Sequence, residues 1–217
     1  MRHRGRIYVD FDDVLCETAR ALMAIAEREY DKRLSFERIF SFDIGQSFGL
    51  TDVQVEHVMS IMHEPAVLAA LEPVEGARDA LTEWSSAGLQ IHVVTGRPPA
   101  THRASKAWLR EQEMPYDDLV FVDKYARSHP AQEGIQCLAL DDLRRFSFSL
   151  GVDDSPQMAG FLSSTLAVPA VLFDRPWNAS AALAGGAEGA GVVRCRGWKE
   201  VMNRFPHLVH PRSPSIP

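Results

Sequence analysis

Three apolar residues run directly into a group of carboxylates near the start of the chain, in the stretch Ile7-Tyr8-Val9-Asp10-Phe11-Asp12-Asp13. A short apolar run of this kind is typical of a buried parallel strand. Ligand sites in open α/β sheets lie just beyond the carboxyl ends of such strands. Clustered carboxylates make one another harder to ionise, so Asp10 and Asp12 predict a site for a hard cation such as Mg²⁺, which prefers oxygen ligands. The alternative is a solvated acidic turn after the strand.

The composition narrows the class of protein. With 217 residues, 46% of them hydrophobic, the chain has room for one large domain or for a domain with an insertion. A net charge of −6 does not favour a nucleic-acid partner. The three cysteines are far apart and form no disulfide framework or metal motif, which is typical of a reducing cytoplasm. The sequence leaves the oligomeric state open.

No segment of the sequence resembles a targeting or membrane segment. The basic start, residues 1–6, precedes an apolar run that is too short for the core of a signal peptide. No apolar run approaches the length of a membrane span. We therefore expect a cytoplasmic protein without a membrane partner.

Residues 18–71 separate the first strand from the next α/β unit, and this connection is longer than a normal one. Its pattern is helical, and the capping box Thr51-x-x-Gln54 predicts that a new helix starts there. We expect a small helical cap at 18–71, a core made of 1–17 and 72–205, and a disordered tail at 206–217.

Aromatic residues are concentrated in this predicted cap. Most of them should form the core of the cap, and one or two should face the site and hold a leaving group, since apolar walls are common in such pockets. The candidates for substrate contact are Phe40, Phe42 and Phe48.

The rest of the chain alternates helical and strand patterns, which predicts an α/β fold with a Rossmann-like parallel sheet flanked by helices. After the first strand, further strands are expected at Leu89–Val94, Leu119–Val122, Phe146–Val152 and Ala170–Phe173. Helices are expected between Val74 and Gly88, at Pro99–Glu113 and at Gly197–Arg204.

Thr95-Gly96-Arg97-Pro98 stands immediately after the second predicted strand. The Thr95 hydroxyl and the free backbone N–H groups that follow it are suited to binding phosphate. The alternative is a plain turn in which Thr95 caps a helix. Together with the acidic strand end at Asp10, the pattern favours phosphate binding by Thr95 and Gly96.

The two strand ends resemble motifs I and II of the haloacid dehalogenase (HAD) superfamily of phosphohydrolases, although this chain has Asp13 where the family usually has Gly. The resemblance implies a motif III lysine that neutralises phosphoryl and carboxylate charge. Lys106 and Lys124 compete for this role, and we expect Lys124 because it follows a strand whereas Lys106 lies inside a helix.

Motif IV of the superfamily is matched by Asp153-Asp154 after the fourth predicted strand. Neighbouring residues point in different directions, so one of the two should be the metal ligand and the other its support. We expect Asp153 to be the ligand.

Several further stretches are similar to the 5'(3')-deoxyribonucleotidase family. They are Ser41-Phe42-Asp43, Phe48-Gly49-Leu50-Thr51, Thr95-Gly96-Arg97, Ala107-Trp108-Leu109 and Phe173-Asp174-Arg175-Pro176-Trp177-Asn178. This likeness implies a Mg²⁺-dependent phosphomonoester hydrolase whose small phosphorylated substrate is a nucleoside monophosphate.

By the same resemblance, Asp10 is the nucleophile that forms an aspartyl-phosphate and Asp12 is the general acid/base. Thr95, Gly96 and Lys124 hold the phosphate. Mg²⁺ is held by Asp10, Asp153, Asp154 and the Asp12 carbonyl. Three alternatives remain: a phosphatase of another small metabolite, a phosphotransferase, and a non-catalytic HAD protein that binds a phosphorylated ligand.

Overall fold

The computed structural model describes residues 5–124, 132, 134–181 and 191–209. Over these residues the chain forms one parallel sheet of seven strands in the order β4-β3-β2-β1-β5-β6-β7. The strands are β1 (Arg6–Asp10), β2 (Gln90–Thr95), β3 (Asp118–Val122), β4 (Cys137–Leu138), β5 (Leu150–Asp153), β6 (Ala170–Phe173) and β7 (Val192–Cys195). The predicted α/β fold with a parallel sheet is confirmed.

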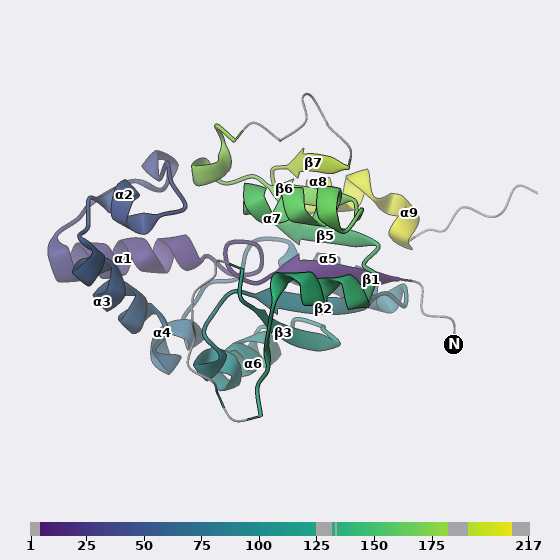
Figure 1. Cartoon of the computed structure of the whole chain (residues 1–217), viewed down its shortest axis with the longest axis horizontal. Coiled ribbons are helices and arrows are strands. Elements are labelled where there is room, and N and C mark those ends of the chain that lie inside the picture. The colour runs from purple at the N-terminus through teal and green to yellow at the C-terminus, as the bar shows by residue number, and fades with distance from the viewer. Residues whose placement is uncertain (1–4, 125–131, 133, 182–190, 210–217) are drawn as a thin grey trace, which may run out of the picture.

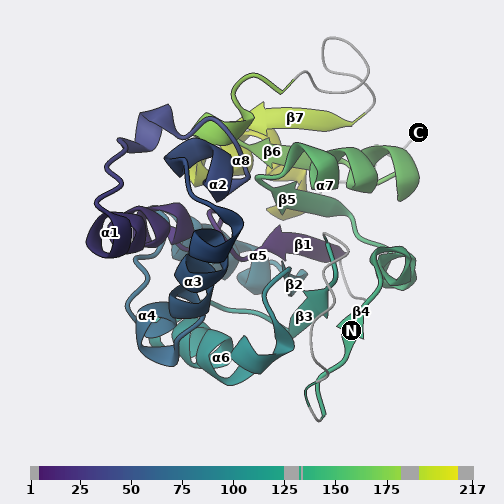
Figure 2. The ribbon, with the colours of Figure 1, turned by 60° about the vertical axis from the view of Figure 1, so that its left-hand side comes forward.

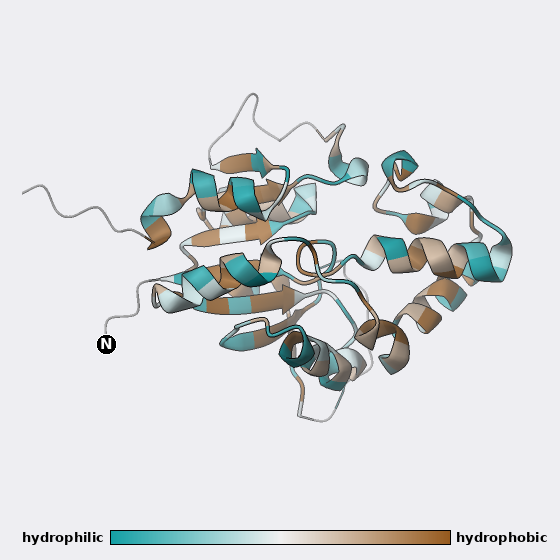
Figure 3. Cartoon of the chain, turned by 180° about the vertical axis from the view of Figure 1, so that it is seen from behind, coloured by the Kyte–Doolittle hydropathy of each residue, from teal (hydrophilic) through white to brown (hydrophobic). Residues whose placement is uncertain are grey.

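Helices cover both faces of the sheet (Figures 1 and 2). On one face Ile7 and Val9 pack in a cluster with residues of α5 (Ala77–Ser86), α6 (His102–Glu111) and α8 (Trp198–Arg204). On the other, Tyr8 packs with residues of η3 (Leu140–Phe146), α7 (Pro156–Gly160) and η4 (Phe161–Thr165). Because both faces are buried, the strands are largely hydrophobic, as Figure 3 shows.

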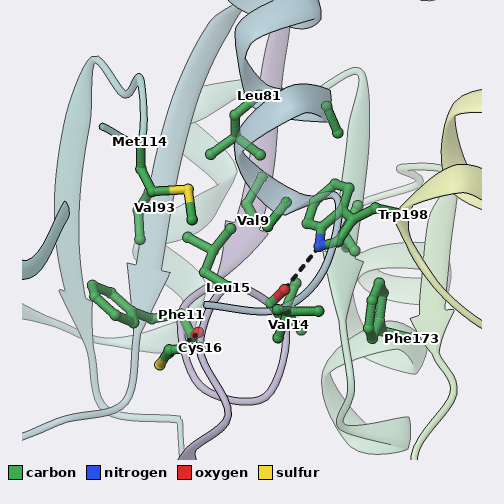
Figure 4. Packing of buried hydrophobic residues seen from close by; sticks show 14 of the residues in the cluster. Val9, Phe11, Val14, Leu15, Cys16, Leu81, Val93, Met114, Phe173 and Trp198 are labelled. Atoms are coloured by element: carbon green, nitrogen blue, oxygen red, sulfur yellow. Dashed lines mark hydrogen bonds between the residues drawn. The ribbon is translucent and has the colours of Figure 1, made fainter. Parts of the chain in front are cut away.

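The loop after β1 is held from the side of the first cluster. Trp198 is 1% exposed, and its indole N–H donates a 2.9 Å hydrogen bond to the Val14 carbonyl (Figure 4). Val14, Leu15 and Cys16 are fully buried in the same cluster. Packing of α8 therefore fixes the backbone that carries the carboxylates beyond β1.

Helices of the predicted cap gather at one end of the sheet, beyond the strand ends and away from the N-terminus (Figure 1). They are α1 (Thr18–Tyr30), η1 (Phe36–Arg38), α2 (Ile44–Phe48), α3 (Asp52–Met62) and α4 (Pro65–Ala69). The capping box of α3 is confirmed: Thr51 N–H donates to Gln54 Oε1 over 2.9 Å, and Gln54 N–H donates to Thr51 Oγ1 over 3.4 Å. The two connections to the sheet lie side by side, since Glu17 N–H donates to the Glu72 carbonyl over 2.9 Å.

The sequence analysis missed two strands, β4 and β7, and placed the start of β5 too early in the chain. Residues 146–149 were expected to begin the fourth strand, but η3 extends to Phe146 and ends at Ser147 in the left-handed region (φ 50°), so β5 starts at Leu150. The edge strands β4 and β7 have only two and four residues, too few for a clear alternation pattern.

The prediction of a disordered tail at 206–217 is wrong for residues 206–209. Pro206 opens a short helix, α9 (Pro206–Val209), because proline is favoured at a first helical position. Residues 210–217 lie outside the described residues, as do 182–190. None of the helices in the described ranges has the length and apolar character needed to cross a membrane.

Candidate active site

The register of neighbouring strands brings the carboxylates of predicted motifs I and IV together. Val9 pairs with Val152, so the next residues, Asp10 and Asp153, end neighbouring strands at the same level. On the other side Asp10 pairs with Val94, which places Thr95 one residue further along the same edge. Residues more than a hundred positions apart in sequence therefore meet at the carboxyl end of the sheet.

Lys124 joins these two carboxylates. Its ammonium lies 2.6 Å from Asp10 Oδ1 and 2.9 Å from Asp153 Oδ2, and its side chain is 1% exposed. Asp153 also accepts a 2.7 Å hydrogen bond from the Tyr8 hydroxyl and a 2.8 Å bond from Ser155 N–H. The rival Lys106 is exposed on α6. The structure thus places Lys124, not Lys106, beside the carboxylates.

Asp10, Asp153 and Asp154 form a buried triad in which one carboxylate oxygen of each residue lies within 4.8 Å of the oxygens offered by the other two. Burial raises the pKa of Asp10 and of Asp154 well above their ordinary values, and the neighbouring carboxylates raise both further. Lys124 supplies one positive charge against three carboxylates. This donor set suits a hard divalent cation.

Asp154 is held by the segment that follows β6. Trp177 Nε1 donates to Asp154 Oδ2 over 2.7 Å, and the Asn178 amide donates to the Asp154 carbonyl over 2.7 Å. Trp177 also meets Phe36 of the predicted cap, with ring centroids 5.8 Å apart in an edge-to-face arrangement. Trp177 therefore connects the carboxylate triad with the helices above it.

Asp12 is bound by an arginine that the sequence analysis did not single out as a site residue. Arg97 Nη2 lies 2.7 Å from Asp12 Oδ1, and Thr18 donates its hydroxyl to the same oxygen over 2.5 Å. Burial raises the pKa of Asp12, but the Arg97 guanidinium outweighs it and holds the net pKa below its ordinary value.

Asp13 occupies the place where glycine was expected, and its backbone shows why glycine is usual there. Its φ of 56° lies in the left-handed region, which Asp tolerates better than most residues. Asp13 Oδ1 accepts the Ala19 N–H over 2.9 Å, and the Asp13 carbonyl accepts from Arg175 Nε over 2.7 Å. Burial raises the pKa of the Asp13 carboxyl to about 8.

Thr95 and Gly96 lie at the end of β2. Thr95 is fully buried, and its hydroxyl accepts the Arg97 N–H over 3.1 Å. Gly96 lines the cavity described next. Their predicted contact with phosphate stays a prediction.

A cavity of about 1090 Å³ lies between the strand ends and the predicted cap, and Asp10, Asp12, Lys124 and Asp154 are among its lining residues. Phe42 and Phe48 line it from the other side. Phe40 is not one of the lining residues and is 62% exposed. Of the three aromatics proposed from sequence, the structure brings two to the cavity.

Sequence reasoning missed Tyr8, Arg97, Trp177 and Asn178 as members of the site. Arg97 was visible only as part of Thr95-Gly96-Arg97-Pro98, and Trp177-Asn178 only as part of a family-like stretch. Tyr8 looked like any other strand residue. Nothing in the local sequence indicated which carboxylate each of these side chains contacts.

The model of a family described as "5' nucleotidase, deoxy (Pyrimidine), cytosolic type C protein" matches residues 4–128, more than half of the chain. The chain belongs to this nucleotidase family. The matched range contains Asp10, Asp12, Thr95 and Lys124, whereas Asp153 and Asp154 lie beyond it.

One relative and two solved structures are examples of proteins to which the chain is similar. A protein of Halalkalibacterium halodurans named "Putative nucleotidase BH1399" is 24% identical over 200 residues, 92% of each chain. A haloacid dehalogenase-like hydrolase of Streptococcus pneumoniae has a TM-score of 0.62 at 13% identity, over 94% of this chain and all of that one. A phosphonoacetaldehyde hydrolase-like protein of Oleispira antarctica has a TM-score of 0.58 at 11% identity, over 97% of this chain and 95% of that one.

The two solved structures share the HAD fold with this chain, and the family supplies the class of activity. This member of the nucleotidase family is a phosphatase, a hydrolase that acts on small phosphorylated compounds.

Proposed function

We propose that the chain is a Mg²⁺-dependent 5'-nucleotidase that releases phosphate from nucleoside monophosphates through an aspartyl-phosphate on Asp10. The observation that carries this proposal is the position of Lys124 between Asp10 and Asp153 at the base of the cavity. A nucleophile, a compensating cation and two further carboxylates at the floor of one cavity suit phosphoryl transfer, in which catalysis is mainly positioning and charge stabilisation.

The metal site in this proposal consists of Asp10, Asp153 and Asp154, with the Asp12 carbonyl as a further ligand. The residues fit such an ion because three buried carboxylates lie close together and Lys124 pairs with two of them, Asp10 and Asp153. Asp153 is our choice as the direct ligand of the motif IV pair. Mg²⁺ held there would offset the negative charge of phosphate and so let an anionic carboxylate approach phosphorus.

The reaction takes two steps. In the first, an Asp10 oxygen bonds to phosphorus, the bond from phosphorus to the ester oxygen breaks, and that oxygen leaves with the electron pair and takes a proton from Asp12. The Arg97 guanidinium lowers the Asp12 pKa, so the protonated form that donates is the minor one but also the stronger acid. In the second, a water oxygen bonds to phosphorus, Asp12 takes the proton, and the Asp10 oxygen leaves with its electron pair. Inorganic phosphate is released and both carboxyl groups return to their starting states.

Lys124 and Thr95 are assigned to the transferring phosphoryl group, and Gly96 offers its backbone beside them. The Lys124 ammonium already lies 2.6 Å from Asp10, so a phosphoryl group bonded to Asp10 would lie within its reach. Donors arranged before the reaction stabilise developing charge without reorganisation.

Selection of the leaving group is assigned to the upper wall of the cavity. Phe42 and Phe48 offer aromatic surface on which a nucleobase can stack, and such stacking is worth about 1–3 kcal/mol per base. Family membership supports nucleotides over other small phosphate esters. Asp10 and Lys124 contact only the phosphate in this proposal, so discrimination must come from this wall.

A phosphate-release screen tests the proposal. Purified protein should hydrolyse nucleoside 5'-monophosphates faster than sugar phosphates, and only when Mg²⁺ is present. A preference for a sugar phosphate would reject the nucleotidase assignment and leave the phosphatase class. Full turnover in chelator would reject the metal site.

A further inference from the structure

Arg97 grips the Asp12 carboxylate with two of its nitrogens. Nε lies 3.1 Å from each carboxylate oxygen, and Nη2 lies 2.7 Å from Oδ1. A planar guanidinium that faces both oxygens fixes the plane of a carboxylate as well as its position. The Asp12 side chain therefore has one defined orientation at the edge of the cavity.

Arg97 is itself held by contacts with Ser105 and Phe11. Nη1 donates to the Ser105 hydroxyl over 3.1 Å, and the guanidinium lies 4.0 Å from the centroid of the Phe11 ring. Phe11 in turn packs on Trp108, with ring centroids 5.3 Å apart. These contacts connect the arginine to α6 and to the loop after β1 through side chains that are fully buried in the core.

Exposure separates the two partners. The Arg97 side chain is 3% exposed and that of Asp12 is 29% exposed. Both residues line the cavity, and the carboxylate is the more exposed of the two. Burying an ion pair usually brings little net stability, because desolvation costs about as much as the attraction returns. A purely structural role explains this pair poorly.

We propose that Arg97 is a positioning residue, which orients Asp12 for the proton transfers at the ester oxygen and at the attacking water. This inference rests on the proposed function of Asp12. It adds a residue that acts through Asp12 and does not itself touch the phosphate.

The inference has a chemical signature. The alkoxide of a nucleoside is a poor leaving group and needs a proton as it departs, whereas p-nitrophenolate is stable without one. Loss of orientation at Asp12 should therefore slow the hydrolysis of thymidine 5'-monophosphate far more than the hydrolysis of p-nitrophenyl phosphate. The quantity to compare is kcat/KM, because it reports the steps up to departure of the leaving group.

The experiment compares Arg97→Met and Arg97→Lys with the wild type on both esters. Arg97→Met should lower kcat/KM for thymidine 5'-monophosphate by about 100-fold, the lower range for general acid–base catalysis. It should lower kcat/KM for p-nitrophenyl phosphate less than about fivefold. Arg97→Lys keeps the charge and should recover about tenfold of the loss. The inhibition constant of inorganic phosphate should stay unchanged.

Arg6→Met is the matched control. Arg6 lies at the start of β1, where its Nη1 donates to the Phe146 carbonyl over 2.8 Å, and it does not line the cavity. Its loss should leave the ratio of the two kcat/KM values unchanged. If Arg97→Met does not fold, Ser105→Ala removes the partner of Nη1 and should shift the same ratio in the same direction.

Two outcomes would overturn the inference. An equal fall in kcat/KM for both esters would show that Arg97 acts on folding or on phosphate binding. An unchanged ratio in both Arg97→Met and Ser105→Ala would show that Asp12 needs no such support. Wild-type protein that hydrolyses neither ester would instead overturn the proposed function, and with it this inference.

Discussion

The floor and the upper wall of the cavity are built differently. The floor consists of side chains from β1 and from the segments after β3 and β5, and Asp10, Lys124 and Asp154 are each at most 5% exposed. The upper wall comes from short helices and their connections, where Phe42 is 45% exposed. Sheet register fixes the first region, whereas local helix packing fixes the second.

Because of this difference, we expect the floor to act on the phosphate and the upper wall to select the leaving group. Groups that handle phosphate need a fixed geometry, and a parallel sheet provides it because every strand is bonded to its neighbours. Groups that contact a leaving group need shape and apolar surface, which short helices can vary. Changes on the floor should therefore alter turnover, and changes on the wall should alter KM.

The largest effect is expected at the nucleophile. Asp10→Asn keeps the size of the side chain and removes the attacking carboxylate, so phosphate release should fall at least about a thousandfold. The melting temperature should not fall, because burial already disfavours the charge of Asp10. Phosphate release assays and thermal unfolding check this, and wild-type turnover by the variant would remove Asp10 from its role.

Metal removal should have the next largest effect. Chelation should reduce activity by at least about a hundredfold, since Mg²⁺ in the proposed site would neutralise the charge between carboxylate and phosphate. Asp153→Ala should weaken Mg²⁺ binding, measured by titration calorimetry, more than Asp154→Ala. The opposite order would exchange the roles of these two residues and leave the site itself intact.

Lys124 lies on the floor of the cavity and Lys106 lies outside it, so the two lysines form a matched pair for mutation. Lys124→Ala should lower kcat by about 100- to 1,000-fold, the usual cost of losing one stabilising donor. Lys106→Ala, on an exposed face of α6, should change kcat less than twofold in the same steady-state assay. A severe loss in the Lys106 variant would contradict the geometry of the floor.

The upper wall should give the smallest effects on catalysis. Phe42→Ala should raise KM for nucleotides about tenfold through lost stacking, and leave KM for p-nitrophenyl phosphate nearly unchanged. Phe40→Ala is the matched control, because Phe40 is exposed and outside the lining residues. Equal KM values for wild type and Phe42→Ala would remove this ring from the substrate site.

Phe48 tests the other half of the wall. It is 7% exposed and packs in a cluster with Ile39 and Trp177. Phe48→Ala should lower the free energy of unfolding by about 3–5 kcal/mol. Denaturant unfolding measures this loss, and a change of KM without one would assign Phe48 to substrate contact alone.

Sequence patterns predicted the class of fold and most of the floor. Apolar runs followed by Asp10, Thr95, Lys124 and Asp153 placed polar groups at strand ends, and the carboxyl ends of parallel strands share one edge. The choice of Lys124 over Lys106 followed from the same rule. The strand ends follow from local periodicity and from a general property of α/β sheets, whereas the expectation of a motif III lysine and a motif IV acidic pair came from the resemblance to the HAD superfamily.

The partners of those groups were not predictable in the same way. Tyr8 at Asp153, Trp177 at Asp154 and Arg97 at Asp12 are contacts between segments far apart in the chain. The same holds for the aromatics: Phe40 and Phe42 are two residues apart, yet only Phe42 lines the cavity.

The sequence by itself determined that this chain forms an α/β sheet with acidic and basic groups at its carboxyl edge. Only the tertiary structure decided how those groups are paired: Lys124 with Asp10 and Asp153, and Arg97 with Asp12. The physical reason is that periodicity records which face of an element is buried, whereas pairing depends on strand order and helix packing. Both are set by contacts across the whole fold.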